Sequence, residues 1–384
     1  MNISQQMIVT KGRSTGFDYL RILLAVAVVA VHTIPVCYGW AAMDMVWQGP
    51  WGPFAFFIIP SFFALSGFLV AGSLERVNNI PVFLTLRATR IFPALCVEVL
   101  ISALLLGPLL TDLPLREYFT DSSFWSYMLN VFGIIHFNLA GVFTHNPVDT
   151  VNNQLWTIPY ELKCYILLTV LGILAITKAP RLLGGAALVL NFAAFLWIWH
   201  RGILAYWDKP TGSMLLVSFL WGVYLYLYRE HVPYNKWLCL SAAIFSYIAI
   251  VWSTGTAYLA PLPIAYVTVY LGLQNPPKTK LIIAGDYSYG IYLYGWPIQQ
   301  TVVHLFPEYR FWYFNLVVSL VVSCFFAWLS WTFVESKVLA QKGHATRFVD
   351  ATCRQIGSFW RKQFGLLLAT KRNDNAPTTS ATDR

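Results

Sequence analysis

Residues 17–32 read FDYLRILLAVAVVAVH, and this stretch decides the fold of the chain. Residues 22–31 carry no polar side chain, so the run predicts a membrane-spanning helix with Arg21 at a membrane surface. Arg21 and His32 are about three helical turns apart, which places both on one helix face, roughly 16 Å apart along the axis. An ionisable group inside a bilayer is costly, so His32 is a candidate functional residue. The alternative is a neutral histidine that hydrogen-bonds a neighbouring helix.

The composition is that of a membrane protein. Of the 384 residues, 57% are hydrophobic and 11% are charged, and mean hydropathy is +0.57. A soluble domain has about 25% charged residues. The net charge of +9 does not indicate a nucleic-acid partner, because Lys and Arg lie in short gaps between apolar runs, where topology and lipid headgroups require them. No pair of the six cysteines has the spacing of a metal site, so we interpret them as buried hydrophobic residues and expect no metal.

About ten apolar runs are long enough to span a bilayer. They lie near 22–38, 52–72, 93–111, 154–177, 182–199, 211–228, 237–253, 257–274, 281–303 and 311–334. We therefore predict an all-α, polytopic membrane helix bundle of about ten transmembrane helices. Lys and Arg concentrate in alternate gaps, so the positive-inside rule predicts that the N and C termini are cytoplasmic.

We divide the chain into a cytoplasmic segment (1–16), a membrane domain (17–336), a basic amphipathic cytoplasmic segment (337–370) and a disordered tail (371–384). Residues 1–16 are polar, so we expect no cleavable signal peptide. The longest exoplasmic gap, about 112–153, is rich in aromatic residues. Its part near 124–143 is predicted to be re-entrant or interfacial. These aromatic rings suit sugar faces, but we favour an interfacial belt.

Two short motifs lie toward the predicted cytoplasmic side. One has residue types suited to binding an anion, and the other has residue types suited to close helix packing. Arg87 and Arg90 are three residues apart on one helix face, a geometry suited to clamping a phosphate, although arginines there also serve as topology anchors. Gly67 permits close approach of helices and Ser66 can hydrogen-bond across them, so we expect a packing role for both.

Polar residues also occur inside later runs. Glu161 lies about two turns inside the fourth run, where a carboxylate needs a partner or a water-filled cavity. His32 and Glu161 approach the outer half of the bilayer from opposite directions, so they are predicted to form a general base with its orienting carboxylate. The alternative is a buried structural hydrogen bond of Glu161. The ninth run is dense in hydroxyls and amides and predicts a helix that lines a polar cavity, capped by Asp286. Glu335 either meets the loop arginines or faces water.

As an ordered set, these motifs resemble the acyltransferase-3 family of integral-membrane acyltransferases over about residues 15–336. The set comprises Arg21 with His32, Phe62-Phe63 with Ser66-Gly67-Phe68-Leu69, Arg87 and Arg90 with Pro93, Leu155-Trp156 with Glu161, residues 288–293, and Trp331 with Phe333-Val334-Glu335. The resemblance implies transfer of an acyl group, commonly acetyl from cytoplasmic acetyl-CoA, to a sugar hydroxyl. Two positions depart from the family: Gly295 stands where members often have His, and Ser336-Lys337 where they often have Arg-Pro.

Together these observations predict a membrane O-acyltransferase with acetyl-CoA as co-substrate. We assign catalysis to His32 as general base with Glu161 and Arg21. Donor binding is assigned to Arg87, Arg90 and Ser66. Substrate binding is assigned to the aromatic and amide residues Trp156, Tyr160, Tyr292, Trp296 and Gln299.

The expected acceptor is a cell-surface or exported polysaccharide, such as an exopolysaccharide or lipopolysaccharide, or its lipid-linked precursor. The expected location is the bacterial cytoplasmic (inner) membrane, with membrane lipids as further partners. The rival interpretation is a proton-coupled secondary transporter, since a membrane His and Glu among polar helices also describe one. A noncatalytic glycan-export partner is a third.

Overall fold

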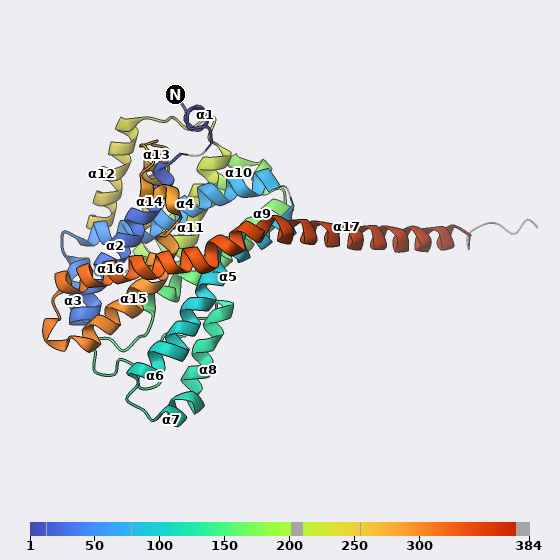
Figure 1. Ribbon diagram of the computed structural model, residues 1–384. Helices are drawn as coiled ribbons and strands as arrows, with labels where there is room; N and C mark the ends of the chain where they lie inside the picture. Colours follow the sequence, from blue (N-terminus) through green and yellow to red (C-terminus); the bar gives the residue numbers. More distant parts are fainter. Residues whose placement is uncertain (13, 78, 201–209, 254, 374–384) are drawn as a thin grey trace, which may run out of the picture.

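The computed structural model describes residues 1–12, 14–77, 79–200, 210–253 and 255–373, and this part of the chain is helical with no β-strand (Figure 1). The predicted all-α class is confirmed. The longer helices are α2 (Gly16–Tyr38), α4 (Gly52–Val77), α5 (Ile80–Ile101), α9 (Ile158–Ile173), α10 (Pro180–His200), α11 (Gly212–Leu227), α12 (Lys236–Trp252), α13 (Pro261–Gly272), α15 (Ser288–Leu305), α16 (Trp312–Ser330) and α17 (Ser336–Asn373).

Shorter elements connect or extend these helices. The short α-helices are α1 (Ile3–Val9), α3 (Trp40–Gln48), α6 (Gly107–Leu110), α7 (Leu115–Thr120), α8 (Ser122–Met128) and α14 (Lys280–Ala284). Two π-helical turns, Ser102–Leu106 and Trp331–Glu335, join α5 to α6 and α16 to α17 without a break. The 3₁₀ turns are Leu129–Phe132, Asn153–Thr157, Ile176–Lys178, Thr256–Leu259 and Pro307–Tyr309.

Each predicted apolar run overlaps one of these helices, but the helices differ in whether they are long enough to span a bilayer. Five helical stretches are long and apolar enough to cross a membrane: Gly16–Tyr38, Gly52–Val77, Ile80–Leu110, Pro180–His200 and Trp312–Gln355. The helix α13 has 12 residues, or about 18 Å, which is short of a bilayer core of about 30 Å. The chain is therefore a multi-pass membrane protein, whereas the count of ten spans and the cytoplasmic location of both termini stay predictions.

The predicted span 281–303 is wrong as a single helix. Residues 285–287 separate α14 from α15. Gly285 stands against the indole of Trp331, and a Cβ at residue 285 would overlap that ring. The close approach of the Trp331 ring therefore requires a glycine at the point where the helix is broken.

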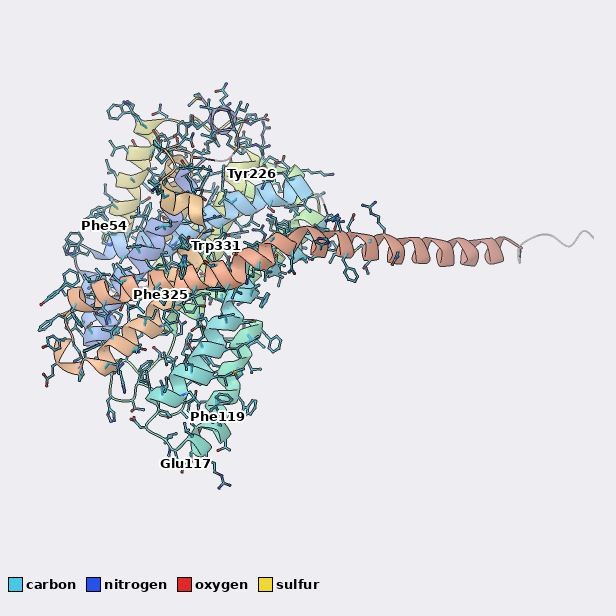
Figure 2. All side chains as sticks on the ribbon, in the orientation of Figure 1. Phe54, Glu117, Phe119, Tyr226, Phe325 and Trp331 are labelled. Carbon is cyan, nitrogen blue, oxygen red and sulfur yellow. The ribbon has the colours of Figure 1, made fainter. Side chains whose placement is uncertain are left out.

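Large apolar side chains cover much of the outer surface, as expected for helices that face lipid. Phe54 on α4 and Phe325 on α16 project outward (Figure 2), with exposed fractions of 59% and 54%.

The cysteines differ in burial: Cys37, Cys164 and Cys239 are buried, whereas Cys324 is exposed. Our interpretation of the cysteines as buried is therefore correct for only part of the set.

The helices α4 and α11 approach each other closely because each presents a glycine to the other. A Cβ on Gly67 would overlap the carbonyl oxygen of Phe219, and a Cβ on Gly222 would overlap that of Ala64. Small residues permit this backbone contact, and without a hydrophobic driving force between helices in lipid such packing determines their association. The predicted packing role of Gly67 is confirmed.

This contact predicts the effect of replacing Gly67 by alanine. Alanine favours a helix over glycine by about 1 kcal/mol, but here the added methyl must push α11 away, at a cost of about 1–3 kcal/mol. We expect a lower melting temperature in detergent micelles. Gly185→Ala is the matched control, because a Cβ there meets no atom within 4 Å. If both variants melted at or above the wild-type temperature, the close contact would not stabilise the protein.

The predicted exoplasmic segment forms a small subdomain that returns along α5. It contains α7, α8 and the 3₁₀ turn Leu129–Phe132, which lie at the opposite end of the molecule from α1 (Figure 1). Tyr118 is fully buried, and its hydroxyl donates to the carbonyl oxygen of Ala103 at 2.7 Å. Trp125 and Phe132 are exposed, at 63% and 69%. The aromatic residues of this segment thus divide between a buried cluster and an exposed surface.

The C-terminal helix α17 continues α16 and projects away from the bundle (Figure 1). The amide of Asn79 donates to Asp350 at 3.0 Å, which fastens α17 to the start of α5. That the basic segment 337–370 lies on a membrane leaflet stays a prediction. Of the predicted disordered tail, residues 374–384 lie outside the described residues.

Candidate functional site

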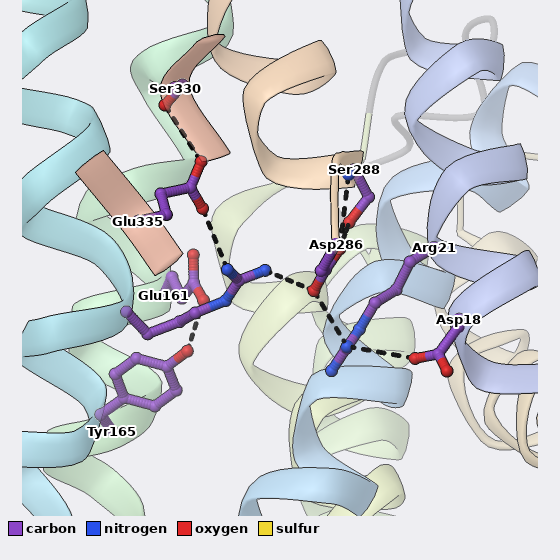
Figure 3. Close-up of polar contacts among 9 residues, drawn as sticks. Asp18, Arg21, Glu161, Tyr165, Asp286, Ser288, Ser330 and Glu335 are labelled. Carbon is purple, nitrogen blue, oxygen red and sulfur yellow. Dashed lines mark hydrogen bonds and ion pairs between the residues drawn. The ribbon is translucent and has the colours of Figure 1, made fainter. Parts of the chain in front are cut away.

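Three carboxylates and two arginines meet where α2, α5, α15 and the second π-helical turn converge (Figure 3). Arg90 donates to Asp286 at 2.6 Å and to Glu335 at 3.1 Å. Arg21 lies 3.3 Å from the same Asp286 and 3.9 Å from Asp18. Residues from distant parts of the chain thus form one ion-pair network.

Local structure explains how both acids reach Arg90. Asp286 precedes α15 in the helix break, and its carboxylate accepts from the hydroxyl of Ser288 at 2.6 Å and from the backbone N–H of Ser288 at 3.3 Å. Glu335 ends the second π-helical turn with 3% exposure, and it accepts from Ser330 at 3.0 Å. The predicted capping role of Asp286 is not confirmed, because Tyr287 is the N-cap residue of α15 and no side-chain cap bond is made there. Glu335 meets an arginine, which is the first of its two predicted alternatives.

Arg87 differs from Arg90, although both lie on α5. It donates to the hydroxyl of Ser73 at 3.3 Å, and no ion pair to Arg87 occurs within the described residues. Its Nε atom is buried and has no hydrogen-bond partner. A buried donor without a partner is uncommon in proteins, and an anionic ligand is one explanation for it.

A cavity of about 980 Å³, which includes space open to solvent, lies beside these arginines. Six of the predicted site residues line it: Arg21, Ser66, Arg87, Arg90, Glu161 and Tyr292. Its other walls are mainly apolar and include Phe62, Phe63, Leu65, Leu69 and Phe219. An apolar cavity with a few convergent charged groups is the usual form of a small-molecule site.

The two ends of this cavity can be placed along α4. The ring of Phe62 packs edge-to-face on Tyr292, with ring centroids 6.2 Å apart, whereas Ser73 contacts Arg87. Eleven residues of α4 separate Phe62 from Ser73, which is about 16 Å along the helix axis. The contact of α4 with Arg87 is therefore well separated from its contact with Tyr292, whereas Arg90 lies over the ring of Tyr289, one helical turn before Tyr292.

His32 lies behind the Tyr292 end and does not line this cavity. Its ring packs edge-to-face on Trp296, with centroids 5.0 Å apart. When the side-chain amide of Gln154 is oriented to satisfy its neighbours, its oxygen lies 3.3 Å from Nδ1 of His32. The hydroxyl of Tyr292 donates to the backbone carbonyl of the same Gln154 at 2.6 Å, so Tyr292 connects the cavity to His32 through Gln154.

The predicted pairing of His32 with Glu161 is not what the structure shows. Glu161 accepts a hydrogen bond from Tyr165 and faces the arginine end of the cavity (Figure 3). The physical reason is the start of the fourth run, where a 3₁₀ turn, Asn153–Thr157, precedes α9. This turn brings Gln154 to His32 and places Glu161 farther along the cavity wall.

The predicted substrate-binding residues are spread over several environments. Tyr292 lines the cavity, whereas Trp296 and Gln299 are fully buried. The indole of Trp296 donates to the carbonyl of Thr150 at 3.0 Å, and Gln299 donates to that of Val29 at 2.7 Å. Trp156 and Tyr160 pack edge-to-face on each other at 5.9 Å, away from the cavity lining. The structure thus brings one of these five residues to the cavity, and their roles stay predictions.

The sequence analysis did not identify Gln154 as a site residue, nor the buried pair of Asn152 and Glu98 near it. Pro297 lacks an N–H and so leaves the carbonyl of Leu293, four residues earlier, without its helical partner. Asn152 donates to this carbonyl at 3.0 Å and to buried Glu98 at 2.9 Å. Two features of the sequence could have indicated these contacts: the polar residues 152–154 before Leu155, and Pro297 inside α15.

Comparison with known proteins adds independent information. Residues 14–335 match the family described as acyltransferase domain. The chain is 27% identical to the O-acetyl transferase of Shigella phage Sf6 over 306 residues, which covers 73% of this chain and 84% of that protein. It is 26% identical to Nodulation protein 10 of Rhizobium leguminosarum bv. viciae over 374 residues, 86% and 94% of the two chains. No solved structure matches it.

Proposed function

Because this chain belongs to the acyltransferase-3 family, we propose that it transfers an acetyl group from acetyl-CoA to a sugar hydroxyl of a glycan. The family and the named O-acetyl transferase relative support a membrane acyltransferase. The observation that carries the finer proposal is the cavity, which runs from Arg87, whose buried Nε atom has no hydrogen-bond partner, to Tyr292, and Tyr292 contacts Gln154 and through it His32 behind the cavity.

The donor would lie along this cavity. The CoA phosphates would bind Arg87 and Arg21 at the charged end, with Ser66 in the adjoining wall, since guanidinium groups bind phosphate well. The pantetheine arm would follow the apolar wall of α4. The thioester at the far end of the donor would then reach the side of Tyr292 nearest to His32. Arg90 is also a predicted phosphate ligand, but its two terminal nitrogens each donate to a carboxylate.

In the proposed reaction, His32 is the general base. The acceptor hydroxyl gives its proton to the free ring nitrogen of His32 while its oxygen attacks the thioester carbonyl carbon. The carbon–sulfur bond then breaks, and the imidazolium returns the proton to the CoA thiolate. Glu161 does not orient His32 in this scheme. It balances the charge of the arginines at the donor end of the cavity.

The acceptor would enter from the predicted exoplasmic side. The loop before the 3₁₀ turn that carries Gln154 lies on α15 there, where Gln300 donates to the carbonyls of Val148 and Thr150 at 2.7 Å. This loop adjoins Trp296 and hence His32. We propose a polysaccharide or lipid-linked sugar as acceptor and the bacterial inner membrane, with its lipids, as the location.

A transfer assay tests the proposed function. Purified protein in liposomes receives radiolabelled acetyl-CoA and a membrane extract that contains glycans. We expect label to leave CoA and to appear in the glycan fraction. Absence of both CoA binding and label transfer would contradict the proposal and would favour the proton-coupled carrier, which a proton-flux assay on the same liposomes would then detect.

The same preparation tests the donor site through Arg87. A charge-assisted hydrogen bond contributes about 1.5–3 kcal/mol, so Arg87→Ala is expected to raise the Kd for CoA about tenfold to a hundredfold in a filter-binding assay. Arg181→Ala, which removes an exposed arginine at the start of α10, is the control and should not change the Kd. Equal affinity of the Arg87 variant and the wild type would exclude Arg87 as a phosphate ligand.

A further inference from the structure

Gln154 is fully buried between α2 and α15, and its side-chain amide meets three polar atoms. The amide nitrogen contacts the backbone carbonyl of Tyr292. The amide oxygen lies 3.1 Å from the backbone N–H of Trp296 and 3.3 Å from Nδ1 of His32.

The backbone of α15 determines which way the amide faces. The carbonyl of Tyr292 can only accept a hydrogen bond, and the N–H of Trp296 can only donate one. The NH₂ group of Gln154 must therefore face Tyr292, and its oxygen must face Trp296. Because an amide oxygen only accepts, the hydrogen bond to His32 requires a proton on Nδ1 of the ring.

We propose that Gln154 is a positioning residue that holds His32 in the neutral tautomer protonated on Nδ1. The inference rests on the proposed function, since it leaves the Nε2 lone pair of His32 free to take the proton of the acceptor hydroxyl. In many enzymes a carboxylate holds the histidine in this way, and the wrong tautomer lowers the rate severely. Gln154 supplies the orienting hydrogen bond without adding a charge.

Two further features fit Gln154 to this position. Gly295 faces the amide from α15, and a Cβ on residue 295 would stand 2.9 Å from the Gln154 amide and 2.8 Å from the Val29 side chain. The absence of a side chain therefore lets Gln154 reach the helix backbone. The hydroxyl of Tyr292 anchors the main chain of Gln154 as well, at 2.6 Å.

Two substitutions at this position separate positioning from packing. Gln154→Leu keeps the approximate volume but removes the acceptor, so we expect kcat to fall by about 10²-fold with little change in KM for acetyl-CoA. Gln154→Glu keeps an oxygen acceptor for His32, and in its protonated form it can donate to the Tyr292 carbonyl in place of the NH₂ group, so it should recover a large part of kcat. Asn191→Leu is the control. Asn191 is a buried residue of α10 whose amide donates to the carbonyl of Tyr258 and accepts from the indole of Trp221. Its loss should lower the melting temperature without lowering kcat.

Nitrogen NMR of ¹⁵N-histidine protein in nanodiscs tests the tautomer without any reaction, with the His32 signals assigned by their loss in His32→Ala. We expect the Nδ1–H tautomer in the wild type and its loss in Gln154→Leu. An Nε2–H tautomer in the wild type, or wild-type kcat in Gln154→Leu, would overturn the proposal. If the wild type showed the Nδ1–H tautomer but transferred no acetyl group, the proposed function would fail while the orienting contact stood.

Discussion

Replacing His32 by alanine is expected to abolish acetyl transfer while CoA binding and membrane insertion stay unchanged. The expected loss is roughly 10²–10⁴ in rate, which is the contribution of a well-placed general base. CoA binding should persist because His32 lies behind Tyr292, outside the cavity that the arginines line. The measurement is label transfer from acetyl-CoA in liposomes, together with the Kd for CoA.

His200→Ala is the matched control, since His200 ends α10 at an exposed position. It should retain wild-type transfer. A His32→Ala protein that retained close to the wild-type rate would exclude a general-base role, because the remaining groups would then supply nearly all of the catalysis. A parallel loss of transfer and of CoA binding would instead indicate that His32 shapes the donor cavity.

The sequence predicted where helices occur, because apolar runs of spanning length have few alternatives in a bilayer. Gly67 was predicted as a point of close approach from residue type alone, and the structure confirms it. A helix start at Asp286 was predicted, but the contact that separates α14 from α15 was not. It depends on Trp331, which is distant in the sequence from Gly285, and a local pattern carries no information about such a contact.

The candidate site was likewise predicted only in part. The sequence identified His32, Arg87, Arg90 and Glu161 as candidates, because charged residues among apolar runs are conspicuous. It could not identify which of them meet. The carboxylates that bind Arg90 lie 196 and 245 residues farther along the chain. The pairing of His32 with Glu161 was inferred from depth in the membrane, whereas contact also depends on helix rotation and on the 3₁₀ turn that brings Gln154 forward.

Arg90→Gln is expected to be the most destabilising single change in the network. It leaves Glu335, which is 3% exposed, without a cationic partner, whereas Asp286 keeps its ion pair with Arg21 at 3.3 Å. Removing one partner of a buried ion pair costs about 3–5 kcal/mol, because the remaining charge stays buried without compensation. We expect a large drop in melting temperature in detergent, or no folded protein.

The variant Arg90→Gln with Glu335→Gln should recover part of this loss, because the second change removes the buried carboxylate that the first left unpaired. Coupled residues in contact typically show interaction energies of about 0.5–3 kcal/mol in such a double-mutant cycle. Additive effects of the two substitutions would contradict a stabilising ion pair.

The same cycle decides between two roles of Arg90. A residue that braces α5 against α15 and the second π-helical turn should lose CoA affinity only as far as the fold is lost, so the double variant should regain both stability and affinity. A residue that binds the donor phosphates should lose affinity in the single and in the double variant alike. Because both terminal nitrogens of Arg90 already donate to carboxylates, and the Nε atom of Arg87 has no partner, the geometry favours the brace for Arg90 and phosphate binding for Arg87.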